Sequence, residues 1–288
     1  MVTVRIKGGL GNQLFQYATG YALSQQLNQP LQFNPSFTKN MTFRGYELPE
    51  LNLSTNAAVM DNDLPVKVRL LKNMYLNKLL RVIQVNRIRY RGGIYWLESG
   101  DISWQVLCAN KAENIYLDGY FQNPLYFDKY RDGLLKQMTP GYVCEPSYVE
   151  VLKEINRCTS VAVHVRRGDF KKENKGFHYI LSEQYYKNAI RYSRMHIQNP
   201  TFFWFSDDIE WVKQNIGNEP DFRFVKIKTS HGDIDDMMLM KNCQHIITAN
   251  STFSWWAAWL NEHKGAIRIC PAKKYGNEQM IPKDWIKL

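Results

Sequence analysis

The segment that decides the predicted fold runs from Val161 to Phe170 and reads VAVHVRRGDF. Side chains along a β-strand alternate between two faces, so the three valines share one face and His164 shares the other with Arg166. Arg167 and Asp169 follow just past the strand. Because ligands of open α/β sheets bind outside the carboxyl ends of the strands, this pattern predicts an anion site. An ion pair between an arginine and Asp169 would explain it equally well.

Strands and helices alternate regularly in the second half of the sequence, which predicts a parallel, doubly wound sheet. The predicted strands cover residues 161–165, 201–205, 222–227, 245–248 and 266–269. Three of them end in polar clusters, at residues 164–169, 206–208 and 250–252, and neighbouring clusters would form one crevice. The last cluster opens a predicted helix, where Asn250 and Ser251 suit either phosphate binding or simple N-capping.

The first half opens with a predicted strand at residues 2–6, a glycine turn reading KGGLGNQ from Lys7, and a helix with apolar spacing from Leu14. Such a turn can present backbone N–H groups to a phosphate, but a tight turn without a ligand fits as well. It is neither a dinucleotide fingerprint nor a Walker A loop. The length of 288 residues predicts two domains, divided into residues 1–145 and 146–288.

The formal net charge of +10 favours an anionic partner such as a nucleotide, a nucleic acid or an acidic membrane. Residues 64–91 read as mostly helical and hold eight basic residues, from Lys67 to Arg91, with no acid between Asp63 and Glu98. A basic amphipathic helix can contact an anionic membrane, although such a run is often only a solvated face.

The five cysteines are scattered, odd in number and contain no C-x-x-C pair, so neither a disulfide framework nor a zinc site is expected. The first residues lack the apolar region of a signal peptide, and no apolar run approaches the roughly 18 to 20 residues of a membrane span. We therefore expect a cytoplasmic protein, with peripheral contact at the inner membrane face as the alternative.

The run from Asp233 to Asp236 contains a D-x-D pattern, which can hold a divalent ion on a sugar nucleotide. The same run begins a predicted helix, where the helix dipole alone favours carboxylates. The six histidines show no metal-ligand spacing, and no G-x-S-x-G nucleophile motif is present. No metal is expected, and a metal-dependent transferase that uses another sugar nucleotide is kept as an alternative.

Five motifs, in order along nearly the whole chain, resemble those of the bacterial α-1,2-fucosyltransferases of glycosyltransferase family 11. They are Gly8–Ala18, Gly119–Gln122, His164–Asp169, Phe205–Asp208 and Asn250–Trp256. Phe170 replaces a tyrosine that is frequent in the family, but keeps the aromatic character. The resemblance implies an α/β, GT-B-like fold of two Rossmann-type domains with the donor site in the cleft between them. It assigns the acceptor to residues 1–145 and GDP-fucose to residues 146–288.

The resemblance also implies inverting transfer of fucose from GDP-β-L-fucose to the 2-hydroxyl of a glycan, usually a terminal galactose, without cofactor, metal or nucleic-acid partner. Arg166 would neutralise the departing diphosphate, Asp169 would orient the arginine pair, and Asn12 would reach the diphosphate from the other domain. His164 and Asp236 would contact guanine or ribose. The expected donor-binding residues are Asn12, His164, Arg167, Asp207, Asp236, Asn250, Ser251, Thr252 and Phe253.

Two features stay open at the level of sequence. The general base that removes the acceptor proton is not identified, and Asp169 and Glu47 are candidates. The acceptor could be an oligosaccharide, a lipid-linked surface-polysaccharide repeat or a protein glycan, and the basic run favours the lipid-linked class. A non-catalytic nucleic-acid-binding protein is the alternative from another class, although no RNP, KH or zinc-finger pattern is present.

Overall fold

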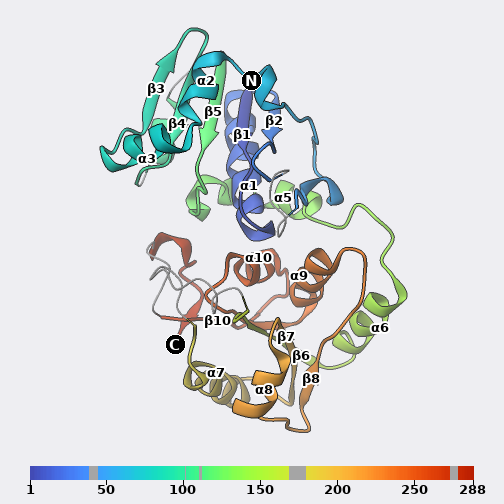
Figure 1. Cartoon of the computed structure of the whole chain (residues 1–288). Helices are drawn as coiled ribbons and strands as arrows, with labels where there is room; N and C mark the ends of the chain where they lie inside the picture. The colour runs from blue at the N-terminus through green and yellow to red at the C-terminus, as the bar shows by residue number, and fades with distance from the viewer. Residues whose placement is uncertain (39–44, 101, 110–111, 169–179, 273–277) are drawn as a thin grey trace. The chain divides into compact units, whose positions relative to one another are not determined.

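A computed structural model describes the chain except residues 39–44, 101, 110–111, 169–179 and 273–277. The chain divides into two compact units, Met1–Gly141 and Tyr142–Leu288. The division lies four residues before the boundary that the sequence predicts between residues 145 and 146. Each unit is built around its own sheet (Figure 1).

The N-terminal unit contains a five-stranded sheet in the order β2-β1-β5-β4-β3. All neighbouring strands are parallel except β3, which runs antiparallel to β4. Its elements are β1 (Val2–Arg5), α1 (Leu10–Leu27), β2 (Leu31–Asn34), α2 (Val66–Leu71), α3 (Met74–Val82), β3 (Arg87–Tyr90), β4 (Gly93–Leu97), α4 (Trp104–Cys108), β5 (Asn114–Asp118) and α5 (Arg131–Gln137), with short 3₁₀ helices at Leu48–Glu50, Asp61–Asp63, Pro124–Tyr126 and Asp128–Tyr130.

The prediction that residues 64–91 are mostly helical is wrong at their carboxyl end. Helix α3 stops at Val82, and Arg87–Tyr90 forms the edge strand β3. The reason is visible in the sequence Arg-Ile-Arg-Tyr, which alternates with a period of two and exposes both arginines while Ile88 packs inward. Charge composition alone concealed this alternation.

The C-terminal unit contains a six-stranded sheet in the order β11-β10-β9-β6-β7-β8, in which every pair is parallel. The predicted α/β class with parallel sheets is therefore confirmed. The elements are α6 (Pro146–Ile155), β6 (Thr159–Val165), α7 (Glu183–His196), β7 (Pro200–Ser206), α8 (Ile209–Asn215), β8 (Phe222–Phe224), α9 (Gly232–Asn242), β9 (His245–Ile247), α10 (Thr252–Leu260), β10 (Arg268–Cys270) and β11 (Ile286–Lys287), with a 3₁₀ helix at Glu278–Met280.

Strand β6 lies in the middle of this sheet and is covered on both faces. Helices α7 and α8 lie on one side of the sheet, and α9 and α10 lie on the other (Figure 1). Val161, Val163 and Val165 belong to the core cluster that includes residues of α7. His164 points to the opposite face, where its ring lies near Phe253 of α10. The predicted separation of valines from His164 is therefore confirmed.

Candidate active site

The carboxyl edge of the C-terminal sheet gathers the polar clusters that the sequence predicts. Strands β9, β6 and β7 are neighbours, so the residues that follow them meet at one edge. The chain leaves β6 through α7 to β7 and through α8 to β8, and α9 then carries it to β9 on the other side of β6. The strand order reverses between β6 and β9, which is the place where open α/β sheets bind ligands.

Asp207 fastens the loop that follows β6. Its Oδ1 accepts a hydrogen bond of 2.9 Å from the Arg167 N–H, and its Oδ2 accepts one of 2.9 Å from the Gly168 N–H. The Nε of Arg166 lies 3.7 Å from the same Oδ2. A Cβ atom on Gly168 would lie 2.9 Å from this oxygen, so the position suits glycine. The direct contact between Asp207 and the donor stays a prediction. The contact that the structure shows is with the backbone of the loop after β6.

The two arginines differ in their surroundings. The Nε of Arg167 donates to Asp208 Oδ2 over 3.2 Å, and its guanidinium carbon lies 3.8 Å from the ring centre of Trp211. The Arg167 side chain is only 14% exposed, whereas that of Arg166 is 28% exposed. Arg166 is therefore the more accessible cation at this edge. Asp169, the predicted partner of the pair, lies outside the described residues.

His164 is a buried and neutral imidazole. Its ring centroid lies 5.4 Å from that of Phe253, and the residue is 5% exposed. Burial, and secondarily the charge of Arg166, lower the pKa of His164 to about 3. Within the described part of the chain its Nδ1 has no hydrogen-bond partner. Since buried polar atoms are normally paired, this nitrogen is suited to meet a ligand atom.

The start of α10 supplies further polar groups to the same edge. Ser251 is the N-cap of α10, and its hydroxyl accepts a 3.3 Å hydrogen bond from the Phe253 N–H. Of the two roles that the sequence allows for this segment, N-capping is therefore confirmed for Ser251. Asn250 is buried, and Thr252 and Phe253 are half-buried in the first turn. A helix start carries partial positive charge from its N–H groups, which favours an anion nearby.

Helix α9 packs beside α10 and carries acids near its start. Asp235 is buried and accepts a 2.7 Å hydrogen bond from the Tyr142 hydroxyl, while the Tyr142 ring stacks on His231. Burial, and then the charges of Asp233 and Asp235, raise the pKa of Asp236 to about 7. The described residues include no group of three His, Cys, Asp or Glu side chains able to hold a metal.

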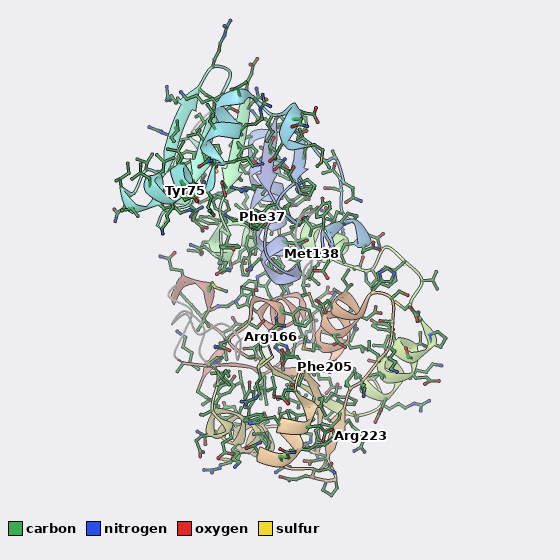
Figure 2. All side chains as sticks on the ribbon, viewed as in Figure 1. Phe37, Tyr75, Met138, Arg166, Phe205 and Arg223 are labelled. Carbon is green, nitrogen blue, oxygen red and sulfur yellow. The ribbon has the colours of Figure 1, made fainter. Side chains whose placement is uncertain are left out.

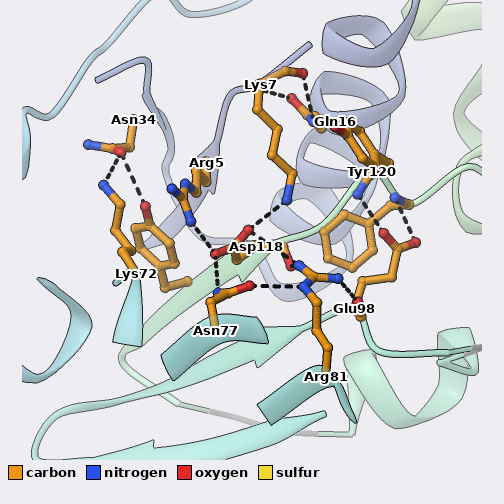
Figure 3. A network of polar contacts seen from close by, with 12 residues as sticks. Arg5, Lys7, Gln16, Asn34, Lys72, Asn77, Arg81, Glu98, Asp118 and Tyr120 are labelled. Atoms are coloured by element: carbon orange, nitrogen blue, oxygen red, sulfur yellow. Dashed lines mark hydrogen bonds and ion pairs between the residues drawn. The ribbon is translucent and has the colours of Figure 1, made fainter. Parts of the chain in front are cut away.

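The N-terminal unit has a buried charge network at the carboxyl edge of its own sheet (Figure 3). Asp118, at the end of β5, is fully buried and accepts from Arg5 Nη1 over 2.7 Å and from Lys7 Nζ over 2.8 Å. The Tyr95 hydroxyl and the Asn77 amide donate to the same carboxylate. Burial alone would raise the pKa of Asp118, but Lys7 and Arg5 outweigh it and hold the pKa well below its usual range.

Sequence reasoning missed this network as part of a candidate site. Lys7 follows β1 and Asp118 ends β5, and these strands are parallel neighbours, so the shared edge was the available signal. The Lys7 ammonium also lies 4.9 Å from the centre of the Tyr120 ring, which is 40% exposed. Glu98 accepts from the backbone N–H groups of Tyr120 and Phe121, which fixes the segment that carries this ring.

The predicted glycine turn before α1 is held by amide side chains. Gln16 bonds both the N–H and the carbonyl of Lys7, and Gln13 donates to the Gly8 carbonyl over 3.0 Å. Gly8 has a φ of 80°, and a Cβ there would lie 2.7 Å from the Asn12 amide nitrogen. Asn12 in turn accepts from Gln122 over 2.8 Å. Two motifs of the resemblance therefore meet at Asn12, whose contact with a diphosphate stays a prediction.

Comparison with known proteins explains why these motifs occur together. The model of glycosyl transferase family 11 matches residues 1–288. The chain belongs to glycosyltransferase family 11. This membership favours the predicted transferase over the nucleic-acid-binding alternative.

Relatives of this family 11 chain differ in the sugar they are named for. It is 33% identical to an alpha-1,2-colitosyltransferase of Escherichia coli, with 100% of this chain and 99% of the relative covered. It is 29% identical to the O-antigen biosynthesis glycosyltransferase WbnK of Escherichia coli, covering 98% and 99%. It is 27% identical to the galactoside 2-alpha-L-fucosyltransferase Sec1 of Mus musculus, covering 90% of this chain and 64% of the relative.

The fold is also shared with solved fucosyltransferase structures. The NodZ alpha-1,6-fucosyltransferase soaked with GDP-fucose matches with a TM-score of 0.54 at 14% identity, covering 90% of this chain and 92% of NodZ. At this identity the similarity concerns the fold alone.

Proposed function

We propose that this family 11 enzyme transfers fucose from GDP-β-L-fucose to the 2-hydroxyl of a terminal galactose in a glycan, with inversion and without a metal. The α-1,2 names among its relatives support the linkage. The observation that carries the proposal is the cluster of Arg166, His164 and the α10 start at the reversal point of the C-terminal sheet.

The leaving diphosphate is negatively charged, so positively charged and N–H groups stabilise it. Breaking the sugar–phosphate bond adds negative charge to GDP, and fixed donors stabilise that charge best when they are already oriented. Arg166 offers a planar fork of donors on a loop that Asp207 holds in place. The α10 N–H groups add partial positive charge nearby. We assign Arg166 to the diphosphate, and Arg167 and Asp207 to positioning the loop.

His164 and Asp236 suit the nucleoside end of the donor. The neutral imidazole of His164 offers its Nδ1 as a hydrogen-bonding atom without adding a charge. The carboxylate of Asp236, when ionised, can accept from the ribose hydroxyls. Because burial raises the pKa of Asp236 to about 7, donor binding that needs the ionised form is expected to strengthen as the pH rises toward 8.

The chemical step is a single displacement at the anomeric carbon. The acceptor oxygen forms its bond to this carbon on the face opposite GDP, and the bond from this carbon to the phosphate oxygen breaks with its electron pair going to GDP. A general base takes the hydroxyl proton. Both predicted bases stay candidates: Asp169 lies outside the described residues, and Glu47 lies in the N-terminal unit, where its N–H donates to Gln13.

The acceptor is assigned to the N-terminal unit at Tyr120. The half-exposed Tyr120 ring offers an apolar face to a sugar ring, and the Lys7 ammonium, which is held by Asp118, lies near the centre of this ring. Replacing Tyr120 by alanine is expected to raise the KM for acceptor while donor affinity stays unchanged. An unchanged acceptor KM would remove Tyr120 from the acceptor site.

A colitosyl donor is the second candidate, because the 33% identical relative is named for that sugar. Colitose is fucose without the 3-hydroxyl group. A site that hydrogen-bonds this hydroxyl discriminates strongly against the sugar that lacks it, whereas a site that merely tolerates it does not. Parallel assays with GDP-fucose and GDP-colitose decide between the two: a large preference for GDP-fucose supports the proposal, and a preference for GDP-colitose replaces it.

The test of the site is Arg166→Lys, compared with the matched change Arg191→Lys on the exposed face of α7. Lysine keeps the charge but loses the two-pronged contact with phosphate oxygens. GDP release is expected to fall by about 100-fold or more in the first variant, in line with the loss of one oriented transition-state donor, and to stay unchanged in the second. Near-normal release by Arg166→Lys would refute the assignment.

A further inference from the structure

Helices α2 and α3 expose an unusual row of apolar side chains. Of the fourteen large hydrophobic residues that are exposed in the described part of the chain, seven fall within residues 66–83. They are Val66, Leu70, Met74, Tyr75, Leu79, Val82 and Ile83. Tyr75 is 77% exposed and lies at the periphery of the N-terminal unit (Figure 2). Exposed apolar residues scattered singly need no explanation, but a cluster of this kind marks an interaction site.

The row is additional to the face with which these helices pack on the sheet. Val68 and Leu71 of α2, together with Leu76 and Leu80 of α3, contact the core cluster beneath the helices. The outward residues Tyr75, Leu79, Val82 and Ile83 follow the spacing i, i+4, i+7 and i+8, which places them on one helix face. Helix α3 is therefore apolar on two sides, and only the inner side is covered within the unit.

The charged side chains on helices α2 and α3 are all basic. Lys67, Arg69 and Lys78 on the helices are exposed. No acidic residue occurs between Asp63 and Glu98. Lys72 belongs to the same basic run in the sequence, but it does not contribute to this exposed surface. That side chain is buried, and its ammonium binds Asn34 and Asp61, so it belongs to the interior of the unit.

We propose that the α2–α3 row docks on an anionic lipid bilayer, with the apolar side chains entering the interface and the surrounding cations meeting the lipid headgroups. Apolar anchors rimmed by lysine and arginine are the features by which helices lie in the plane of a membrane surface. A second copy of the chain is a poorer occupant, because two faces with the same positive charge repel each other. Among the helices of the described residues, none is long and apolar enough to cross a bilayer.

The proposal does not depend on which sugar nucleotide is used. It bears on the acceptor, because an enzyme held at an anionic surface by its N-terminal unit meets glycans carried on lipids at a raised local concentration. The relative WbnK, named for O-antigen biosynthesis, is compatible with such an acceptor. Docking is therefore expected to raise transfer to a glycan on a lipid anchor in vesicles, and to leave transfer to the same glycan in water unchanged.

The experiment is co-sedimentation of the full chain with vesicles of phosphatidylcholine alone or with added phosphatidylglycerol. The apolar variant is Leu79→Gln with Val82→Gln, and the charge variant is Arg69→Gln with Lys78→Gln. The matched control is Val143→Gln with Met195→Gln, which changes two apolar side chains of the C-terminal unit that are at least as exposed as Leu79 and Val82. Because all six positions are exposed, the thermal unfolding midpoint is expected to stay unchanged and serves as the folding control.

The wild-type chain and the control pair are expected to bind vesicles that contain phosphatidylglycerol. The charge variant should bind roughly fivefold more weakly for each cation removed, and the apolar variant at least about tenfold more weakly. Equal binding by all variants, or no preference for the anionic vesicles, would overturn the proposal. A wild-type dimer that the apolar variant turns into a monomer, without vesicle binding by either, would also overturn it and assign the row to self-association.

Discussion

Asp236 offers the most quantitative prediction, because its substitution should stabilise the protein more at a pH where the folded carboxyl is ionised than at a pH where it is protonated. Burial, then the charges of Asp233 and Asp235, raise its pKa from 3.8 to about 7 in the folded chain. Between these two values the folded state holds a proton that the unfolded state has lost, so stability falls as the pH rises through this window. Above the folded pKa, the folded chain contains an ionised, half-buried carboxylate next to two further acids.

The size of the effect follows from about 1.4 kcal/mol for each unit of pKa difference. Compared with a side chain that is always neutral, the Asp236 carboxyl lowers the free energy of unfolding by at most about 4 kcal/mol at pH 8 and by less than about 2 kcal/mol at pH 5. The variant Asp236→Asn removes this loss, so its free energy of unfolding should rise by about 2 to 3 kcal/mol more at pH 8 than at pH 5. For a unit of this size the unfolding midpoint should rise about 5 to 10 °C more at the higher pH.

Thermal unfolding followed by circular dichroism at both pH values measures this difference directly. The control is Glu150→Gln, which neutralises an exposed carboxylate on α6 of the same unit and should change the midpoint little at either pH. An equal midpoint shift at pH 5 and pH 8 for Asp236→Asn would refute the reasoning that burial and like charge raise its pKa.

Three further perturbations test the two sheet edges. Gly168→Ala places a Cβ 2.9 Å from Asp207 Oδ2, so it should loosen the arginine loop and raise the KM for donor about tenfold with little change in melting; an unaltered donor KM would contradict the clamp. Asp118→Asn leaves Lys7 and its neighbouring cations without their buried counter-charge. The free energy of unfolding, measured with denaturant, should fall by about 3 kcal/mol. An unchanged free energy of unfolding would contradict this and mean that water reaches the network. In the wild-type enzyme the donor KM should fall between pH 6 and pH 8, and this trend should vanish in Asp236→Asn; a trend that survives the substitution belongs to another group.

The C-terminal sheet could be predicted because its strands and helices alternate cleanly. The valines of β6 marked the face that packs on α7, and three strands with polar ends indicated the sheet edge that holds the candidate site. The edge strand β3 was not predicted, because its arginines continue the basic run of the helices before it. Its period of two, rather than its charge, carried the information.

The partners within the site could not be predicted from the sequence. Arg167 donates hydrogen bonds to Asp207 through its backbone N–H and to Asp208 through its side chain. These acids lie about forty positions away in the sequence, and they come close because the β6–β7 register places Val165 beside Ser206. Nothing local in the sequence distinguishes this pairing from one with Asp169. Lys72 illustrates the same limit, since only the fold shows that its charge is buried against Asp61.

The measurement that tests the central claim most directly is GDP release from GDP-fucose in EDTA, with and without a galactose-terminated oligosaccharide, followed by linkage analysis of the product. The account predicts release that depends on the acceptor, proceeds without metal and yields an α-1,2 linkage. Absence of release from GDP-fucose in the presence of every acceptor offered, including a lipid-linked one, together with activity on a uridine-activated sugar, would contradict it.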